Sequence, residues 1–152
     1  MPGFKHTGKV VYWDGGIESN KWLYATSVKD EAIRLGLGSA LEKTFETDRF
    51  SYVDDLFFIW NDKPFNKQQI YNLKIYLYTI PFNPEVWVKN DNPYNQIDTE
   101  WVTQQTVVPS ARQQIALEQY LRGKTFIITN HHDLDVTPME LVNDERVTKL
   151  RF

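Results

Sequence analysis

The sequence predicts an α+β fold, in which strands are in the majority and a few helices lie beside them. Short runs rich in β-branched and aromatic residues recur along the chain, and each is bounded by Gly, Pro, Asn or Asp. Only a few segments combine helical spacing with a helix-capping residue. The 152 residues suit a single domain with a core of its own, and no internal repeat divides them.

The first part of the chain predicts two short strands and one long helix. Lys9–Trp13 is a β-like run closed by a Gly-containing turn, and Trp22–Ala25 is a second strand. Apolar residues recur at helical spacing from Val28 to Thr44, so we expect a helix there. Thr26 or Ser27 is the expected N-cap, because a hydroxyl can accept a free N–H of the first turn.

The remainder of the chain predicts further strands and two helices. Ser110 is expected to cap a helix over Ala111–Leu121 that ends at Gly123, and Pro138 is expected to begin another. The strands are predicted from apolar or alternating runs at Val53–Trp60, Leu73–Ile80, Glu100–Val108, Thr125–Thr129 and Val147–Phe152, with a brief pairing at Val86–Val88.

Composition excludes several classes of protein. The net charge is -3, and no long block of like charges occurs, so tight, salt-driven binding of nucleic acid is not expected. The chain has no cysteine, which excludes disulfides, thiolate chemistry and cysteine-ligated zinc. It has no apolar run of membrane-spanning length and no signal-peptide pattern, so the expected compartment is the cytoplasm of the cell that makes or receives it.

Glu100 is the strongest candidate for a catalytic group. It follows a loop dense in Asn, Asp and Pro, Lys89–Thr99, and it opens a β-branched run that ends at Val108. A carboxylate at the first position of a strand, beside a polar loop, is expected at a sheet edge rather than in a core. There it would be held by the sheet and could still meet a ligand.

Two other short motifs accompany this glutamate, and the three occur in the order His, Tyr, Glu. His6 is followed by Gly8, Tyr24 leads through Ser27 into the predicted helix, and Glu100 opens the segment Glu-Trp-Val. This order resembles the His–Tyr–Glu pattern of the ADP-ribosyltransferase superfamily, in the branch of poly(ADP-ribose) polymerases and diphtheria-type toxins. The chain is similar in size to the rifampicin-modifying ADP-ribosyltransferases.

The resemblance covers about residues 4–109, and residues 110–152 would form a C-terminal extension of helix and strand. It implies two small packed β-sheets with flanking helices, and NAD as co-substrate. It also implies transfer of ADP-ribose to a protein, nucleic acid or small-molecule acceptor, with Glu100 as the catalytic residue. His6, Gly8, Tyr24 and Ser27 would bind NAD.

Two questions stay open at the level of sequence. A bound dinucleotide needs a cation for its phosphates, and Lys5, Lys21 and Arg49 are equal candidates for this contact. The alternative function is a non-catalytic module of the same fold that acts through protein–protein contacts. It is favoured by Thr7 between the His and the Gly, by the short spacing from His6 to Tyr24, and by the aromatic residues Trp87 and Tyr94, which we expect to be exposed. A related RNA-repair phosphotransferase would need a cluster of Arg and His that the sequence lacks.

Two further segments contain suggestive residue types. Gly36–Ser39 is glycine-rich, but it lies inside the helical pattern and lacks the Lys-Ser/Thr ending of a phosphate loop. His131–Asp135 contains metal-ligand residue types, but no third spaced ligand accompanies the adjacent histidines, so we expect a polar turn and no metal.

Overall fold

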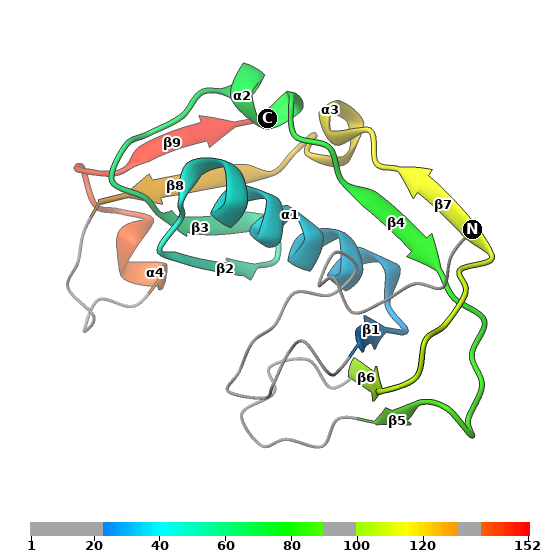
Figure 1. The fold of residues 1–152 in the computed structure, drawn as a ribbon. Coiled ribbons are helices and arrows are strands. Elements are labelled where there is room, and N and C mark those ends of the chain that lie inside the picture. The colour runs from blue at the N-terminus through cyan, green and yellow to red at the C-terminus, as the bar shows by residue number, and fades with distance from the viewer. Residues whose placement is uncertain (1–22, 90–99, 131–137) are drawn as a thin grey trace. The chain divides into compact units, whose positions relative to one another are not determined.

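The structure of the chain is a computed structural model that describes residues 23–89, 100–130 and 138–152 (Figure 1). The described residues are of mixed α/β type, with several small sheets and few helices. They divide into two compact units, one within Met1–Ser39 and Ile75–Ile115, and the other within Ala40–Lys74 and Ala116–Phe152. The described strands form three sheets rather than two.

The first unit contains a three-stranded and a two-stranded sheet. β6 (Glu100–Thr103) lies between β1 (Leu23–Thr26) and β5 (Val88–Lys89), and both pairings are antiparallel. β4 (Tyr76–Thr79) pairs with β7 (Ala111–Gln114). The core of this unit consists of apolar residues from β1, β6 and the segment before β5, namely Leu23, Tyr24, Trp87 and Val102.

α1 (Lys29–Phe45) confirms the predicted helix to within one residue at each end. Its buried residues include Ala32, Ile33, Leu37 and Leu41. Gly36 and Gly38 are also buried within the uninterrupted helix, so the glycine-rich segment is part of a helix and not a phosphate loop. On the surface, Arg34 Nε donates to Asp30 Oδ2 at 2.7 Å, one helical turn away.

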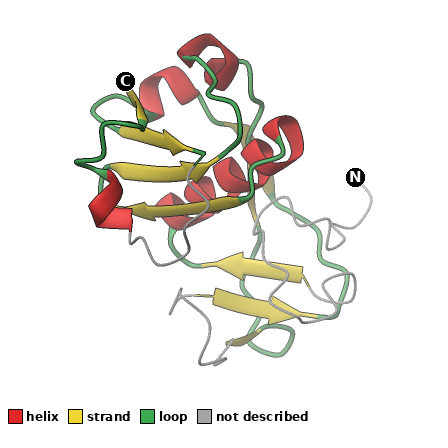
Figure 2. Cartoon of the chain, turned by 90° about the vertical axis from the view of Figure 1, so that its left-hand side faces the viewer, coloured by secondary structure: helices red, strands yellow, loops and turns green. Residues whose placement is uncertain are grey.

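The second unit contains a four-stranded sheet in the order β2–β3–β8–β9 (Figure 1), and Figure 2 draws the strands of the chain in yellow. Its strands are β2 (Arg49–Val53), β3 (Leu56–Trp60), β8 (Thr125–Thr129) and β9 (Thr148–Arg151). β3 and β8 pair in parallel at the centre. One face packs Phe58, Trp60 and Ile127 against Leu141 of α4 (Pro138–Leu141), while Phe57 and Phe126 are buried on the other. Burial on both faces explains why the two central strands are almost continuously apolar.

Three helices that lie wholly within the second unit are short. α2 (Lys67–Tyr71) begins with a capping box in which Gln69 N donates to Asn66 Oδ1 and Asn66 N donates to Gln69 Oε1, each at 2.9 Å. α3 (Leu117–Tyr120) ends three residues before Gly123, which has a positive φ of 79°. α4 begins at Pro138, as predicted, because proline suits the first helical position.

The predicted helix over Ala111–Leu121 is wrong in its first half. Ala111–Gln114 instead forms β7, and the N–H groups of Ser110 and Ile115 donate to the carbonyl oxygens of Thr79 and Ile75 at 2.8 Å each. Ser110 Oγ also donates to the carbonyl of Thr79, at 3.2 Å, so it joins two strands and caps no helix. Pairing with β4 outweighs the helical tendency of these exposed residues.

Candidate functional site

Tyr24 and Glu100 lie on neighbouring strands and project to the same face of the sheet. In the antiparallel pairing of β1 with β6, Tyr24 is opposite Val102 and Thr26 is opposite Glu100. Direct cross-strand partners share a face, and so do residues two apart on one strand. Tyr24 and Glu100 are therefore diagonal neighbours, a position in which an aromatic or long side chain reaches across the strand pair.

Both of these side chains are buried, Tyr24 with 3% and Glu100 with 2% of its surface exposed. This corrects the expectation that Glu100 lies at an exposed sheet edge. β6 is the middle strand of the described sheet, because β1 and β5 pair with it on either side. Glu100, the first residue of β6, therefore has the β1 backbone beside it at Thr26. The polar residues that precede Glu100 in the sequence did not indicate this pairing.

Ser27 is exposed and directly follows β1. The neighbouring Thr26, and not Ser27, supplies the hydrogen bond at the start of α1, where Thr26 Oγ1 accepts from Val28 N at 3.1 Å. Ser27 lines a cavity that Tyr24 and Glu100 do not line. Of the predicted NAD-binding residues that the structure describes, Ser27 therefore lines the cavity and Tyr24 does not.

Several of the predicted residues lie outside the described residues. These are His6 and Gly8, the phosphate-contact candidates Lys5 and Lys21, the aromatic residue Tyr94, the strand Lys9–Trp13 and the segment His131–Asp135. Arg49, the third phosphate-contact candidate, lies on β2 in the second unit, where its guanidinium carbon is 4.5 Å from the centre of the Trp60 ring. Its charge already has an aromatic partner there.

Trp87 differs from the expectation of an exposed contact residue. Only 5% of its surface is exposed, and it belongs to the core of the first unit. Its neighbour Val88 is 63% exposed. The side chain at the surface of this segment is therefore the valine, and the tryptophan packs inward.

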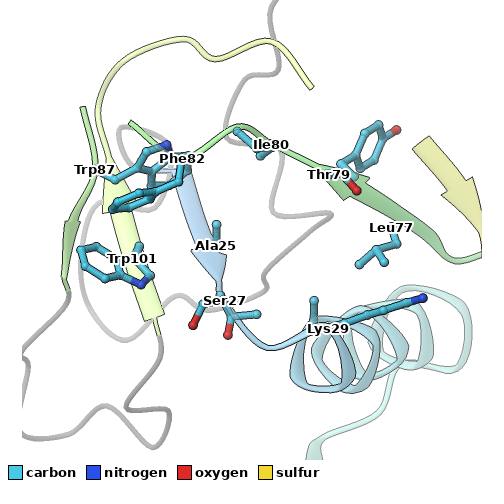
Figure 3. Close-up of a pocket in the computed structure, with 12 residues that line it drawn as sticks. Ala25, Ser27, Lys29, Leu77, Thr79, Ile80, Phe82, Trp87 and Trp101 are labelled. Atoms are coloured by element: carbon cyan, nitrogen blue, oxygen red, sulfur yellow. The ribbon is translucent and has the colours of Figure 1, made fainter. Parts of the chain in front are cut away.

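A cavity of about 350 Å³ lies within the first unit (Figure 3). Its walls come from the end of β1, the first turn of α1, β4 and the segment after it, Trp87 and β6. The described residues that line it are Ala25, Thr26, Ser27, Lys29, Ala32, Leu77, Tyr78, Thr79, Ile80, Phe82, Trp87 and Trp101. Phe82, Trp87 and Trp101 gather at one end of the cavity, and Lys29 lies at the other (Figure 3).

The cavity meets the strand pair mainly on the face opposite to Tyr24 and Glu100, although Thr26, which shares their face, also lines it at the end of β1. Ala25 and Trp101 are direct cross-strand partners, and both line it. Ala25 follows Tyr24 on β1, and Trp101 follows Glu100 on β6. Because successive side chains of a strand point to opposite faces, Ala25 and Trp101 point away from the face of Tyr24 and Glu100. The β1–β6 pair thus separates a buried Tyr–Glu pair from an aromatic cavity.

Lys29, Phe82 and Trp101 were not predicted from the sequence to bind a ligand. A signal was present for Trp101, because strand alternation sends the neighbour of an inward Glu100 to the opposite face. No comparable signal identifies Phe82 or Lys29, since their approach depends on how the strand pair, β4 and α1 pack together.

The described residues were also searched for metal-binding groups and for membrane-spanning helices. In residues 23–89, 100–130 and 138–152, no three His, Asp or Glu side chains lie close enough together to hold a metal ion. No helix in the same ranges has the length and apolarity needed to cross a membrane.

Comparisons of the chain with family models, with curated proteins and with solved structures each gave no match. The class of the protein is therefore defined by its own architecture, a mixed α/β chain with several small sheets and few helices.

Proposed function

We propose that this chain transfers ADP-ribose from NAD to an acceptor, and that an ADP-ribosyltransferase-like fold is part of the same proposal. The observation that supports it is the position of Tyr24 and Glu100, which lie diagonally on one face of two hydrogen-bonded strands. These residues are far apart in sequence, and they are the aromatic ring and the acid that the resemblance assigns to NAD. A common face would allow both side chains to contact the same NAD molecule.

The chemistry of transfer suits these two side chains. The bond between nicotinamide and the ribose C1′ breaks, and nicotinamide leaves with the bonding electron pair. The acceptor then forms a bond to C1′ and releases a proton. Positive charge develops on the ribose, as in glycoside cleavage, and the Glu100 carboxylate would stabilise it and hydrogen-bond the ribose hydroxyls. The Tyr24 ring would stack on the flat nicotinamide.

Burial sets a condition on this proposal. Tyr24 and Glu100 are 3% and 2% exposed, so their face of the sheet must become accessible when NAD binds. His6 would contact the adenosine ribose, as the resemblance implies. The acceptor is a protein, a nucleic acid or a small molecule, and the reaction would occur in the cytoplasm of the producing or receiving cell.

The experiment that tests the proposal measures nicotinamide release. Purified protein is incubated with millimolar NAD, and free nicotinamide is separated by chromatography and quantified. We expect Glu100→Gln to lower the rate by about 100-fold, because loss of one stabilising group at a developing charge has an effect of this order. Glu118→Gln is the matched control, since Glu118 is exposed on α3 in the second unit.

Circular dichroism of each variant verifies that the fold is intact. Tyr24→Phe keeps a ring for stacking and should retain most of the release, whereas Tyr24→Leu should lose it. Equal rates for the unsubstituted protein and folded Glu100→Gln would refute a catalytic role for this acid.

A second candidate function is a non-catalytic module of the same fold that acts through protein contacts. The near-complete burial of Glu100 favours it, because an acid that reacts with a ligand ordinarily faces a cleft. Trp87 no longer supports it, since its side chain is buried. Absence of nicotinamide release from well-folded protein, with or without NAD binding, is the outcome expected of this module.

A further inference from the structure

We propose that the cavity of the first unit binds a small molecule in which a flat aromatic ring is joined to an anionic group. This site would lie across the strand pair from Glu100, and the proposal goes beyond the proposed transfer reaction. Three features of the cavity support it: its aromatic end, its single cationic side chain and its size.

The aromatic end is formed by Phe82, Trp87 and Trp101. The Phe82 and Trp101 rings meet edge to face, with centroids 5.0 Å apart and an interplanar angle of 68°. Phe82 is 59% exposed, whereas Trp87 is 5% exposed and fixes the inner wall. Rings arranged in this way offer both faces and edges to a further ring, and aromatic pairs of this kind are favourable beyond the area that they bury.

The charged end is formed by Lys29. Lys29 is exposed at the start of α1, and it is the one charged side chain among the described residues that line the cavity. Ser27 and Thr79 are also exposed lining residues, and they add hydroxyl groups to the walls. With no described carboxylate in the lining, the charge of this end is positive, and an anionic group of the ligand complements it.

The dimensions favour a small molecule. A volume of about 350 Å³ falls near the lower end of the range of small-molecule pockets, roughly 300–1,000 Å³. A polyanion such as nucleic acid would need several cations along an extended surface, and one lysine does not provide them. The surrounding strands and helix turn are hydrogen-bonded, so much of the site is formed in advance and little ordering opposes binding.

The test compares 1-naphthyl phosphate with its neutral counterpart 1-naphthol. Binding is followed by ¹⁵N NMR of the tryptophan indole N–H groups and by quenching of tryptophan fluorescence. We expect the phosphate to bind about tenfold more tightly than the naphthol, with shifts at Trp101 and none at Trp60, which belongs to the second unit. Lys29→Gln should bring the two dissociation constants close together.

Control variants separate the contributions. Lys149→Gln removes an exposed lysine of β9 and should change neither dissociation constant. Trp101→Leu should weaken both probes, and the exposed Phe82→Ala serves the same purpose if Trp101→Leu does not fold. Glu118→Gln should leave both constants unchanged, because Glu118 is an exposed residue of α3 that does not line the cavity.

The proposal is overturned by any of three results. These are absence of saturable binding of 1-naphthyl phosphate, a preference for the phosphate that survives in folded Lys29→Gln, and shifts centred on Trp60 of the second unit. Failure of this test leaves the transfer proposal untouched, since nicotinamide release is measured without the naphthyl probes.

Discussion

Glu100 lies directly opposite Thr26 in the β1–β6 pair, and Thr26 Oγ1 also accepts the N–H of Val28 at 3.1 Å. Thr26 thus pairs with β6, which carries the buried Glu100, and its hydroxyl group also contacts the start of α1. Thr26 lines the cavity as well, so the same residue borders both proposed sites. The geometry at this point should therefore be sensitive to the loss of a single hydroxyl group.

Thr26→Val removes the hydroxyl while keeping the branched shape of the side chain. We expect a loss of about 1 kcal/mol in the free energy of unfolding, since the N–H of Val28 loses its acceptor at a helix start. Thr26→Ser keeps the acceptor and should lose less than half as much. Urea denaturation followed by circular dichroism measures both values.

The opposite ranking would contradict this role of the hydroxyl. If Thr26→Ser were the more damaging substitution, the methyl group and its packing would be the important feature. Thr26→Val keeps the β-branched shape of the side chain, so its effect can be attributed to the lost hydroxyl group.

Segments with a strong local pattern were predicted well from the sequence. α1, β8 and α4 lie where helical spacing, an apolar run and a proline at the first helical position indicated them. β9 also falls inside the predicted strand Val147–Phe152. In each case the pattern that identifies the element lies within the element itself, so no distant contact was needed to recognise it.

Segments that depend on partners were predicted poorly. Val53 was assigned to the strand that ends at Trp60, but it ends β2, and a two-residue turn at Asp54 leads into β3. Asp54 has a φ of 52°, a left-handed conformation that Asp tolerates better than most residues. β7 exists because β4 lies beside it, and its own sequence is compatible with a helix.

The candidate site was predictable only in part for the same reason. The sequence indicated that Tyr24 and Glu100 are on strands, and strand alternation fixes which neighbours share their faces. Their juxtaposition depends on the register of β1 against β6, which a sequence pattern does not specify. The cavity needs β4 and α1 in addition, so its residues could not be identified from any one segment.

Gly123 should be required for its backbone conformation and not for its small size. Its φ is 79°, and no described heavy atom lies within 4 Å of a Cβ built at this position. Gly123→Ala is therefore expected to lower the free energy of unfolding by about 1–2 kcal/mol through backbone strain alone. Gly123→Asn should lose clearly less, although asparagine is larger, because it adopts left-handed conformations more readily. Thermal and urea denaturation distinguish the two, and a cost that rises with side-chain size would contradict this explanation.

The stability of the turn between α4 and β9 is expected to depend more on the backbone hydrogen bond that Asp144 accepts than on its ion pair with Arg146. Asp144 Oδ1 accepts from Arg146 N at 2.9 Å, and Oδ2 accepts from Arg146 Nη2 at 2.8 Å. Hydrogen bonding and charge from Asp144 raise the pKa of Arg146, so the guanidinium stays protonated at any ordinary pH. Because the pKa of Arg146 is raised, the contribution of this pair to stability is lost only at a pH above the usual titration range of arginine.

Arg146→Ala should leave the melting temperature almost unchanged, because its side chain is 70% exposed and water screens the pair. Asp144→Ala also removes the acceptor for the backbone N–H, with an expected loss of about 1 kcal/mol. Asp144→Asn keeps an oxygen acceptor and should fall between them. Equal melting temperatures for Arg146→Ala and Asp144→Ala would show that the backbone hydrogen bond contributes nothing.

The core of the second unit should show energetic coupling between Phe126 and Phe152. Their rings meet edge to face with centroids 4.7 Å apart, and Phe126 also lies 5.3 Å from the Phe57 ring. Phe126 has no exposed surface, so Phe126→Leu leaves a space in a closed core and should destabilise the protein by about 1–3 kcal/mol. Phe152→Leu is expected to have the smaller effect, because this side chain is only half-buried.

A double-mutant cycle measures the ring contact itself. We expect the two losses to sum to more than the loss in the double variant, with a coupling energy of about 0.5–1.5 kcal/mol, since removal of either ring already removes the edge-to-face contact. Phe152→Leu combined with Thr26→Val of the first unit is the control, and its losses should add to within about 0.5 kcal/mol. Strict additivity in the Phe126–Phe152 cycle would mean that the two rings contribute through area burial alone.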